Sequence, residues 1–251
     1  MPEMAIAHAL ELIEQGADII DIGGESTRPG ADPVTESEEL ARVIPVVEGL
    51  AHQVTIPISI DTTKSQVAGQ ALDRGASIIN DVSALREDPA MASVIARSDA
   101  AVVLMHMQGT PKTMQRSPQY VDIGAEVLQF LQERVQIAVQ KGIARTNIIL
   151  DPGFGFGKLV SHNLDLLNKL SSFTVLNCPL LVGLSRKGFI GTVVGKSVER
   201  REWGTAAAVA LAVDRGAHII RVHDVAMAID VVTMAAALSP YWATTGQECD
   251  A

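Results

Sequence analysis

Cysteine is nearly absent from the chain, which has only Cys178 and Cys249 among its 251 residues. Two cysteines so far apart match neither a metal-binding motif nor a disulfide framework. A chain of this size without a disulfide framework is typical of a reducing compartment. We therefore expect a cytoplasmic protein whose stability depends on its hydrophobic core.

Aromatic residues and long apolar runs are also scarce, and the net charge is negative. Aromatic side chains make up 4% of the residues and hydrophobic ones 47%, so we expect a core built mainly from Ile, Val, Leu and Ala. No basic N-terminal segment leads into a long apolar run, so we expect no signal peptide and no membrane partner. The formal net charge of −9 argues against nucleic acid and acidic membranes as partners. An anionic small-molecule substrate remains compatible with it, because a few local cations are enough to bind one.

The chain does contain a repeat. Gly-Ala-x-Ile-Ile occurs at residues 16–20, 75–79 and 216–220. Glycine suits the left-handed residue that ends a helix, and the apolar run after it suits a strand buried on both faces. Polar residues follow each copy. A repeated helix–glycine–strand unit with polar strand ends predicts an α/β barrel whose active site lies at the carboxyl ends of the strands.

Apolar runs alternate with helical patterns along the chain, which predicts parallel strands joined by right-handed crossovers. A TIM (β/α)8-type barrel typically has about 250 residues, close to the length of this chain. We assign residues 1–238 to one barrel domain, and residues 239–251 to a C-terminal tail without a readable function. The predicted strands are seven in number and cover residues 17–23, 56–60, 77–82, 100–105, 147–150, 180–184 and 218–222.

Polar side chains stand directly after these strands, where the carboxyl ends of barrel strands meet at the mouth of the site. Any one of them could simply cap the next helix. Together they exceed what capping requires, so we predict a binding site. A lone histidine at a strand end, His106, is interpreted as structural. The polar strand-end residues include Asp21, Asp61, Asn80, Asp151, Lys187, Arg221 and His223.

Seven segments follow one another in a characteristic order: DIGGESTRPG, SIDTTK, IINDVS, VLMHMQGTPKTMQ, DPGFGFGK, GLSRKGFIG and RVHDV. In sequence and order they resemble those of the dihydropteroate synthases, of the pterin-binding barrel family, over about residues 16–238. The resemblance implies a transferase of folate biosynthesis. Its reaction would join 6-hydroxymethyl-7,8-dihydropterin diphosphate to p-aminobenzoate, releasing diphosphate and 7,8-dihydropteroate.

The resemblance also implies how the pterin is bound. One pterin edge carries a 2-amino group beside a ring N–H, and a carboxylate can accept from both at once; Asp151 is our first choice for this role. Asp61 and Asn80 are expected to complete the ring of polar groups. Lys187 is expected to donate to the carbonyl oxygen and the adjacent ring nitrogen. Met105 either lines the pterin slot or is an ordinary core methionine.

For the diphosphate, the resemblance implies an anion clamp formed by Arg221 and His223, which share a face of an extended segment. A magnesium ion bridging the diphosphate is the expected cofactor. The family's dissociative route needs no covalent nucleophile, so electrostatic preorganisation would be the main catalytic effect. The expected catalytic residues are Lys187, Asp61, Arg221 and His223.

The resemblance places p-aminobenzoate over Lys187, with its carboxylate at the N-terminus of the following helix, a position that favours anions. Some relatives have a hydroxyl residue where this chain has Gly188, so backbone N–H groups would bind the carboxylate here. The predicted p-aminobenzoate contacts are Thr27, Arg28, Pro29, Phe156, Ser185 and Gly188.

In the family, a first strand and a mobile loop precede the helix expected here over residues 3–15. That loop carries an Asn that helps to bind diphosphate and metal, so the metal ligands of this chain stay unknown. Seven strands would leave a gap in the barrel and an exposed sheet edge, and we expect weak or no synthase activity from the chain as written. Two other interpretations remain open: an inactive truncated paralogue or subunit, and a pterin-binding methyltransferase barrel that handles no diphosphate. The resemblance further implies a homodimer.

Overall fold

Parallel strands form a curved wall that surrounds the predicted site. The computed structural model describes residues 2–28, 30–239 and 241–242. Its seven strands confirm the seven predicted apolar runs, although residues 17–19 of the first run precede the strand and two strands end one residue later than predicted. The strands are β1 (Ile20–Gly23), β2 (Ile58–Asp61), β3 (Ile78–Asp81), β4 (Ala101–Met105), β5 (Ile148–Asp151), β6 (Leu181–Gly183) and β7 (Ile219–Arg221).

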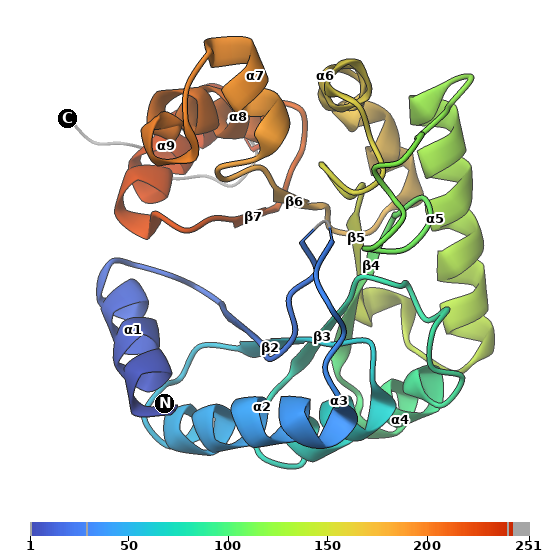
Figure 1. Ribbon diagram of the computed structural model, residues 1–251, viewed down its shortest axis with the longest axis vertical. Helices are drawn as coiled ribbons and strands as arrows, with labels where there is room; N and C mark the ends of the chain where they lie inside the picture. Colours follow the sequence, from blue (N-terminus) through green and yellow to red (C-terminus); the bar gives the residue numbers. More distant parts are fainter. Residues whose placement is uncertain (1, 29, 240, 243–251) are drawn as a thin grey trace.

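Helices cover the outside of this wall (Figure 1). Three of them begin at a side chain that accepts a hydrogen bond from the first turn: Thr35, Asp122 and Asp224. No helix in the described residues is long and apolar enough to cross a membrane. The helices are α1 (Pro2–Glu14), α2 (Glu36–Ala51), α3 (Ser65–Leu72), α4 (Met91–Ser98), α5 (Ile123–Gln140), α6 (Val160–Asn168), α7 (Gly188–Val194), α8 (Glu202–Asp214) and α9 (Val225–Leu238), with the short 3-10 helices η1 (Arg145–Asn147), η2 (Leu170–Leu176) and η3 (Val198–Arg200).

The wall does not close into a complete barrel. Strands β1 to β5 form one parallel sheet in sequence order, and β6 and β7 form a second. A single parallel bridge between Leu150 and Leu180 joins the two. Within the described residues β1 pairs only with β2, and β7 only with β6. The fold is therefore the predicted α/β barrel type, open between its first and last strands.

The glycines of the repeat have the backbone conformation that the sequence predicted. Gly16, Gly75 and Gly216 have φ angles of 101°, 108° and 91°. This left-handed region strains residues with a side chain, whereas glycine enters it freely. Each glycine thus ends a helix and turns the chain into the next strand, and the three repeats lead into β1, β3 and β7.

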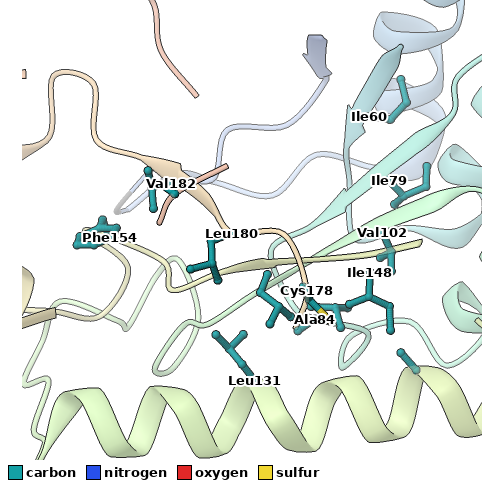
Figure 2. Packing of buried hydrophobic residues seen from close by; sticks show 14 of the residues in the cluster. Ile60, Ile79, Ala84, Val102, Leu131, Ile148, Phe154, Cys178, Leu180 and Val182 are labelled. Atoms are coloured by element: carbon teal, nitrogen blue, oxygen red, sulfur yellow. The ribbon is translucent and has the colours of Figure 1, made fainter. Parts of the chain in front are cut away.

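Two apolar layers lie on opposite faces of the strands. Outside, residues such as Ile79, Val102 and Ile148 join one large cluster with Leu131 of α5 (Figure 2). Inside, neighbouring positions on the same strands form a smaller cluster, here called the inner cluster. Its members are Ile78, Val103, Ile149 and Leu181, with Ile19, Ala101 and Ile219 packed against them. The inner cluster fills the barrel interior and forms the floor of the site.

Candidate active site

Residues two positions beyond the inner cluster stand at the carboxyl ends of the strands. Side chains alternate between the two faces of a strand, so these residues point inward like the apolar residues beneath them. Asp61, on β2, pairs in register with one of them, Asn80. Along each of these strands, an inward-facing apolar residue of the floor is therefore followed, two positions later, by an inward-facing residue of the site. The positions are Asp21, Asn80, Met105, Asp151, Gly183 and Arg221.

An arginine–carboxylate cluster spans the open side of the wall. Arg221 Nε lies 2.7 Å from Asp21 Oδ2, and Arg221 Nη2 lies 3.2 Å from Asp61 Oδ2. Asn80 Nδ2 donates to Asp21 Oδ2 over 3.4 Å. Asp21 and Arg221 stand on the two strands that do not pair with each other, so a side-chain ion pair joins β1 to β7 where backbone hydrogen bonds do not.

Three oxygen atoms in this cluster are buried without a partner in the described residues: Asp21 Oδ1, Asp61 Oδ1 and Asn80 Oδ1. Unpaired buried acceptors are costly, so a ligand that brings N–H or O–H donors would satisfy them. Burial first, and then the nearby Asp21 carboxylate, raise the pKa of Asp61 to about 7 against the opposing effect of Arg221. The site is therefore short of hydrogen-bond donors.

Asp151 and Lys187 face each other across the same interior. Burial raises the pKa of Asp151, and Lys187 opposes this effect. Burial lowers the pKa of Lys187 to about 8 against the attraction of Asp151. Asp151 Oδ1 already accepts from Gly153 N over 2.7 Å. The predicted pair of carboxylate and lysine is thus brought together, with one carboxylate oxygen oriented by the backbone.

One side of the site is apolar. Met105 is 2% exposed and lies in a cluster with Val82, Met107 and Met114, against which Phe156 packs. Lys187 Nζ lies 4.4 Å from the centre of the Phe156 ring, a cation–π distance. Met105 is therefore both well packed and adjacent to Phe156. Met107 and Met114 were not predicted as part of the site, although both stand in the segment VLMHMQGTPKTMQ.

A cavity of about 240 Å³ opens beside Asp61. Thr27 lines it, as do residues from the loops that follow β1, β2 and β4. Pro29, another predicted p-aminobenzoate contact, lies outside the described residues. The loop after β1 is fastened by Lys64, which contacts both Glu25 and the buried Glu39.

His223 lies among cations. Its pKa is lowered by burial first and then by Arg186, Arg221, Arg28 and Lys187. Its Nδ1 is 2.9 Å from Ser185 Oγ. Arg221 contacts carboxylates rather than His223, so the two residues of the predicted anion clamp share an electrostatic environment and no direct contact. A concentration of positive charge at this point suits an anion.

The described residues include no group of three or more His, Cys, Asp or Glu side chains placed to hold a metal ion. Mg²⁺ commonly binds through one or two carboxylates together with substrate phosphates. Binding of this kind does not require a group of three protein ligands.

The loop after β5 depends on the backbone conformation of Gly153. Gly153 has φ +72°, and a Cβ built on it would lie 1.9 Å from the His106 carbonyl oxygen. We expect Gly153→Ala to lower the free energy of unfolding by about 3 kcal/mol or more, because backbone strain and a backbone clash add. Urea denaturation measures this change.

Two other glycines separate the effect of backbone strain from the effect of the clash. Gly195 has φ +65° but open space around its Cβ position, and Gly188 has open space without a positive φ. Gly195→Ala should therefore cost about 1 kcal/mol, and Gly188→Ala close to nothing. Equal losses for Gly153→Ala and Gly195→Ala would show that the clash with His106 is relieved at no cost.

The fold and site define a class: a parallel α/β barrel protein with buried carboxylates, an amide, a lysine and an arginine gathered at the carboxyl ends of its strands. The family described as "Pterin binding enzyme" matches residues 1–223. The dihydropteroate synthase of Escherichia coli K12 is 48% identical over 228 residues, 91% of this chain and 80% of that protein.

Solved structures agree. A Yersinia pestis dihydropteroate synthase in complex with a sulfonamide drug superposes with a TM-score of 0.92 at 43% identity, over 94% of this chain and 86% of that one. A Xanthomonas albilineans dihydropteroate synthase with 4-aminobenzoic acid gives 0.88 at 48% identity, over 93% and 83%. The chain belongs to the dihydropteroate synthases, the pterin-binding transferases that form dihydropteroate in folate biosynthesis.

Proposed function

We propose that this chain condenses 6-hydroxymethyl-7,8-dihydropterin diphosphate with p-aminobenzoate through the strand-end site. One observation carries the assignment to these residues: buried acceptors without partners stand at the ends of β1, β2 and β3, opposite Asp151 and Lys187. A pterin ring supplies the donors that this site lacks. The anion-favouring surroundings of His223 lie beside it.

The pterin is oriented by Asp151 and Lys187. Asp151 Oδ1 is held by the backbone of Gly153, which fixes the carboxylate plane against the 2-amino and ring N–H donors. Lys187 donates to the pterin carbonyl oxygen and the neighbouring ring nitrogen. Asp61 and Asn80 supply further hydrogen bonds along the ring, and Met105 lies against its face.

Bond cleavage and bond formation follow from this arrangement. The C–O bond to diphosphate breaks, and the electron-rich pterin stabilises the methylene cation that remains. Arg221 and His223 stabilise the departing anion; to do so, Arg221 exchanges its carboxylate contacts for phosphate oxygens. The aniline nitrogen of p-aminobenzoate then forms the new C–N bond and loses a proton. No covalent nucleophile is required, so preorganised charge supplies most of the rate enhancement.

p-Aminobenzoate lies over Lys187 and Phe156, with the loop after β1 on its other side. Ser185 and the backbone at Gly188 face its carboxylate, and Thr27 and Arg28 complete the contact. The short distance between Lys187 and Phe156 supports this placement, because the two side chains together offer a flat, partly cationic surface to an aromatic anion.

The assay that tests the function is dihydropteroate formation from the two substrates with Mg²⁺, together with direct measurement of pterin binding. We expect binding but slow turnover, because β1 and β7 do not pair with each other and carry Asp21 and Arg221 at their ends. Robust turnover would overturn the expectation of weak activity and support the function. Absence of pterin binding would overturn the function itself.

The open wall supports one alternative, a chain that folds and binds pterin without turnover as an inactive paralogue or subunit. The same assay distinguishes the two, since this alternative predicts binding and no product at any enzyme concentration. The methyltransferase alternative lacks such support, because the cations around His223 suit a diphosphate that a methyltransferase does not handle.

Magnesium, oligomeric state and location belong to the proposal as well. We propose that Mg²⁺ bound to the substrate diphosphate would supply Lewis-acid stabilisation of the leaving group. We also propose a cytoplasmic homodimer in which the C-terminal helices meet. Trp203, Met234 and Leu238 on α8 and α9 are 80%, 62% and 73% exposed, which supports an interface there. Light scattering with size-exclusion chromatography tests the dimer.

The affinity for 6-hydroxymethyl-7,8-dihydropterin is expected to depend on pH. Asp61 accepts from the ring when ionised, above its pKa of about 7. Lys187 donates as an ammonium, below its pKa of about 8. Affinity should therefore be highest between these values and fall toward about tenfold per pH unit on either side. Isothermal titration calorimetry from pH 5.5 to 9.5 measures the profile.

Two variants show which residue causes the fall in affinity on each side of this pH profile, here called its acid limb and its alkaline limb. Asp61→Asn should remove the acid limb, because the amide does not titrate. Lys187→Arg should remove the alkaline limb, because a guanidinium stays charged across this range. An unchanged profile in either variant would assign that limb to another group.

A further inference from the structure

Lys158 is a buried lysine whose role the proposed mechanism does not include. It is 3% exposed, and among the described ion pairs it has no carboxylate partner. Its Nζ lies 2.9 Å from His106 Nδ1, 2.8 Å from the Gly153 carbonyl oxygen and 3.0 Å from the Phe156 carbonyl oxygen. A buried amine in this position needs an explanation, because burial without a counter-charge is costly.

These contacts join two parts of the site. His106 follows β4, and its backbone N–H donates to Asp151 O at the end of β5. Gly153 and Phe156 belong to the glycine-rich loop after β5. On its other side the loop is held by Asn163 of α6, whose Oδ1 accepts from Gly155 N over 2.7 Å. Gln115 and Tyr120 also donate to the loop, at the Gly155 and Gly157 carbonyl oxygens. Among these contacts, the Lys158 amine is the one that holds the Gly153 and Phe156 carbonyl groups.

The loop that Lys158 holds carries two functional contacts. Gly153 N donates to Asp151 Oδ1, and the Phe156 ring lies beside Lys187. Lys158 itself does not line the cavity beside Asp61. A shift of the Gly153 or Phe156 backbone would therefore turn Asp151 away from the pterin edge and move the surface that receives p-aminobenzoate.

We propose that Lys158 is a positioning residue: its amine, braced by His106, clamps the carbonyl groups of Gly153 and Phe156 and so sets Asp151 and Phe156 for the two substrates. This inference rests on the proposed function for the identity of the substrates. The clamp itself is a property of the folded chain without ligand.

The number of hydrogen-bonding groups supports the clamp in both protonation states. As an ammonium, Lys158 has three donors, which match two carbonyl oxygens and a neutral His106 Nδ1. As a neutral amine it donates to both carbonyls and accepts from His106 Nδ1–H, since a neutral histidine exists in either tautomer. All of the amine's hydrogen-bonding capacity is used in each case.

The electrostatic surroundings of Lys158 allow both of its protonation states near neutral pH. Burial lowers the pKa of Lys158 to about 7, with Asp151 opposing the effect and Lys187 adding to it. Burial, Lys158 and Arg86 lower the pKa of His106 to about 2, so the imidazole is neutral at physiological pH. The clamp is therefore expected to hold as Lys158 titrates through neutrality.

Hydrogen exchange without ligand tests the clamp, and steady-state kinetics test its role. In Lys158→Met we expect the amides of Gly155 and Phe156 to exchange about tenfold faster, a change that one charge-assisted hydrogen bond is sufficient to produce. The KM for p-aminobenzoate should rise about tenfold while kcat changes less, because the loop is displaced rather than the leaving-group contacts. Lys169→Met, on an exposed lysine paired with Asp122 and Asp165, is the control and should change neither quantity.

A second pair of variants applies if Lys158→Met does not fold. His106→Leu removes the brace and should loosen the loop, whereas His106→Asn keeps a hydrogen-bonding group there and should restore most of its protection. In wild type, loop protection corrected for intrinsic exchange should be equal at pH 6 and pH 8.5. A tenfold fall in loop protection at pH 8.5 would overturn the inference that the clamp holds in both protonation states of Lys158.

Unchanged exchange and unchanged KM in the Lys158 and His106 variants would overturn the proposal while leaving the proposed function intact. Loss of loop protection in Lys158→Met, together with a wild-type chain that keeps its loop protection but binds neither substrate, would have the opposite meaning. It would support the clamp and overturn the function.

Discussion

Asp151→Asn is expected to weaken binding of 6-hydroxymethyl-7,8-dihydropterin by about 100-fold or more. Asp151 Oδ1 already accepts from Gly153 N, so the single oxygen of an asparagine would keep that bond and turn its NH2 group toward the ligand. Two donors on the pterin edge would then face a donor. Each charge-assisted hydrogen bond lost is worth about 1.5–3 kcal/mol, and the unpaired donors add to the cost.

The substitution is nearly isosteric, so stability should change little and binding should change much. Calorimetric titration measures the affinity, and urea denaturation confirms that the variant is folded. Asp165→Asn, on a half-exposed aspartate of α6 paired with Lys169, is the matched control and should bind like wild type. Binding within threefold of wild type in Asp151→Asn would mean that the pterin edge is held elsewhere, with Asp61 the next candidate.

Lys187→Met is expected to lower kcat/KM for dihydropteroate formation by about 1,000-fold. The ammonium serves both substrates: it donates to the pterin carbonyl and lies 4.4 Å from the Phe156 ring centre, where p-aminobenzoate packs. Methionine keeps the length and apolar stem of lysine while removing the charge. The loss combines charged hydrogen bonds with a cation–π contact, and it falls on the reacting centre, where electrostatic stabilisation has its largest effect.

The kinetic constants for the two substrates show which contact matters more. A rise in both KM values with little change in kcat would indicate binding alone, whereas a fall in kcat indicates stabilisation of the transition state. Lys169→Met again provides a control for loss of a lysine charge. Lys187→Arg should recover part of the activity, because it restores the charge in a different geometry. Full activity in Lys187→Met would exclude this lysine from the chemistry.

Much of this site was predictable because it depends on local periodicity. The three Gly-Ala-x-Ile-Ile repeats place glycine at the helix end and an apolar run in the strand, and the structure confirms both through φ angles of 101°, 108° and 91°. Period-two alternation then makes Asn80 and Arg221 follow the inward Ile78 and Ile219. Such residues can be assigned by counting along one strand, without knowledge of its neighbours.

Other features depend on which segments meet, and sequence reasoning missed them. Asp21 was noted only as a polar strand end, yet it pairs with Arg221, 200 residues away. His106 was interpreted as structural without a partner being named, and its partner Lys158 stands 52 residues further along the chain. No local pattern signals either pair. Lys158 stands at the end of the glycine-rich segment DPGFGFGK, where the local sequence does not indicate that its side chain is buried.

The start of α2 also combines a feature set by local sequence with one set by a neighbouring side chain. Thr35 caps α2 as the motif Thr-x-x-Glu predicts, by accepting from Glu38 N. The Glu38 side chain contacts Arg42 instead of returning to the cap. A local motif therefore placed the helix start, while competition from a neighbouring charge determined where the glutamate side chain points.

The residue pattern alone was sufficient to show a parallel α/β barrel of seven strands with polar carboxyl ends, since strand and helix periodicity and glycine conformation are properties of short segments. The ordered segments were sufficient to indicate the family. Tertiary structure established what the segments do to one another: the unpaired edges of β1 and β7, the Arg221 bridge across them, the raised pKa of Asp61 and the buried Lys158 clamp. Each of these depends on distance and desolvation, which arise only when residues remote in sequence are packed together.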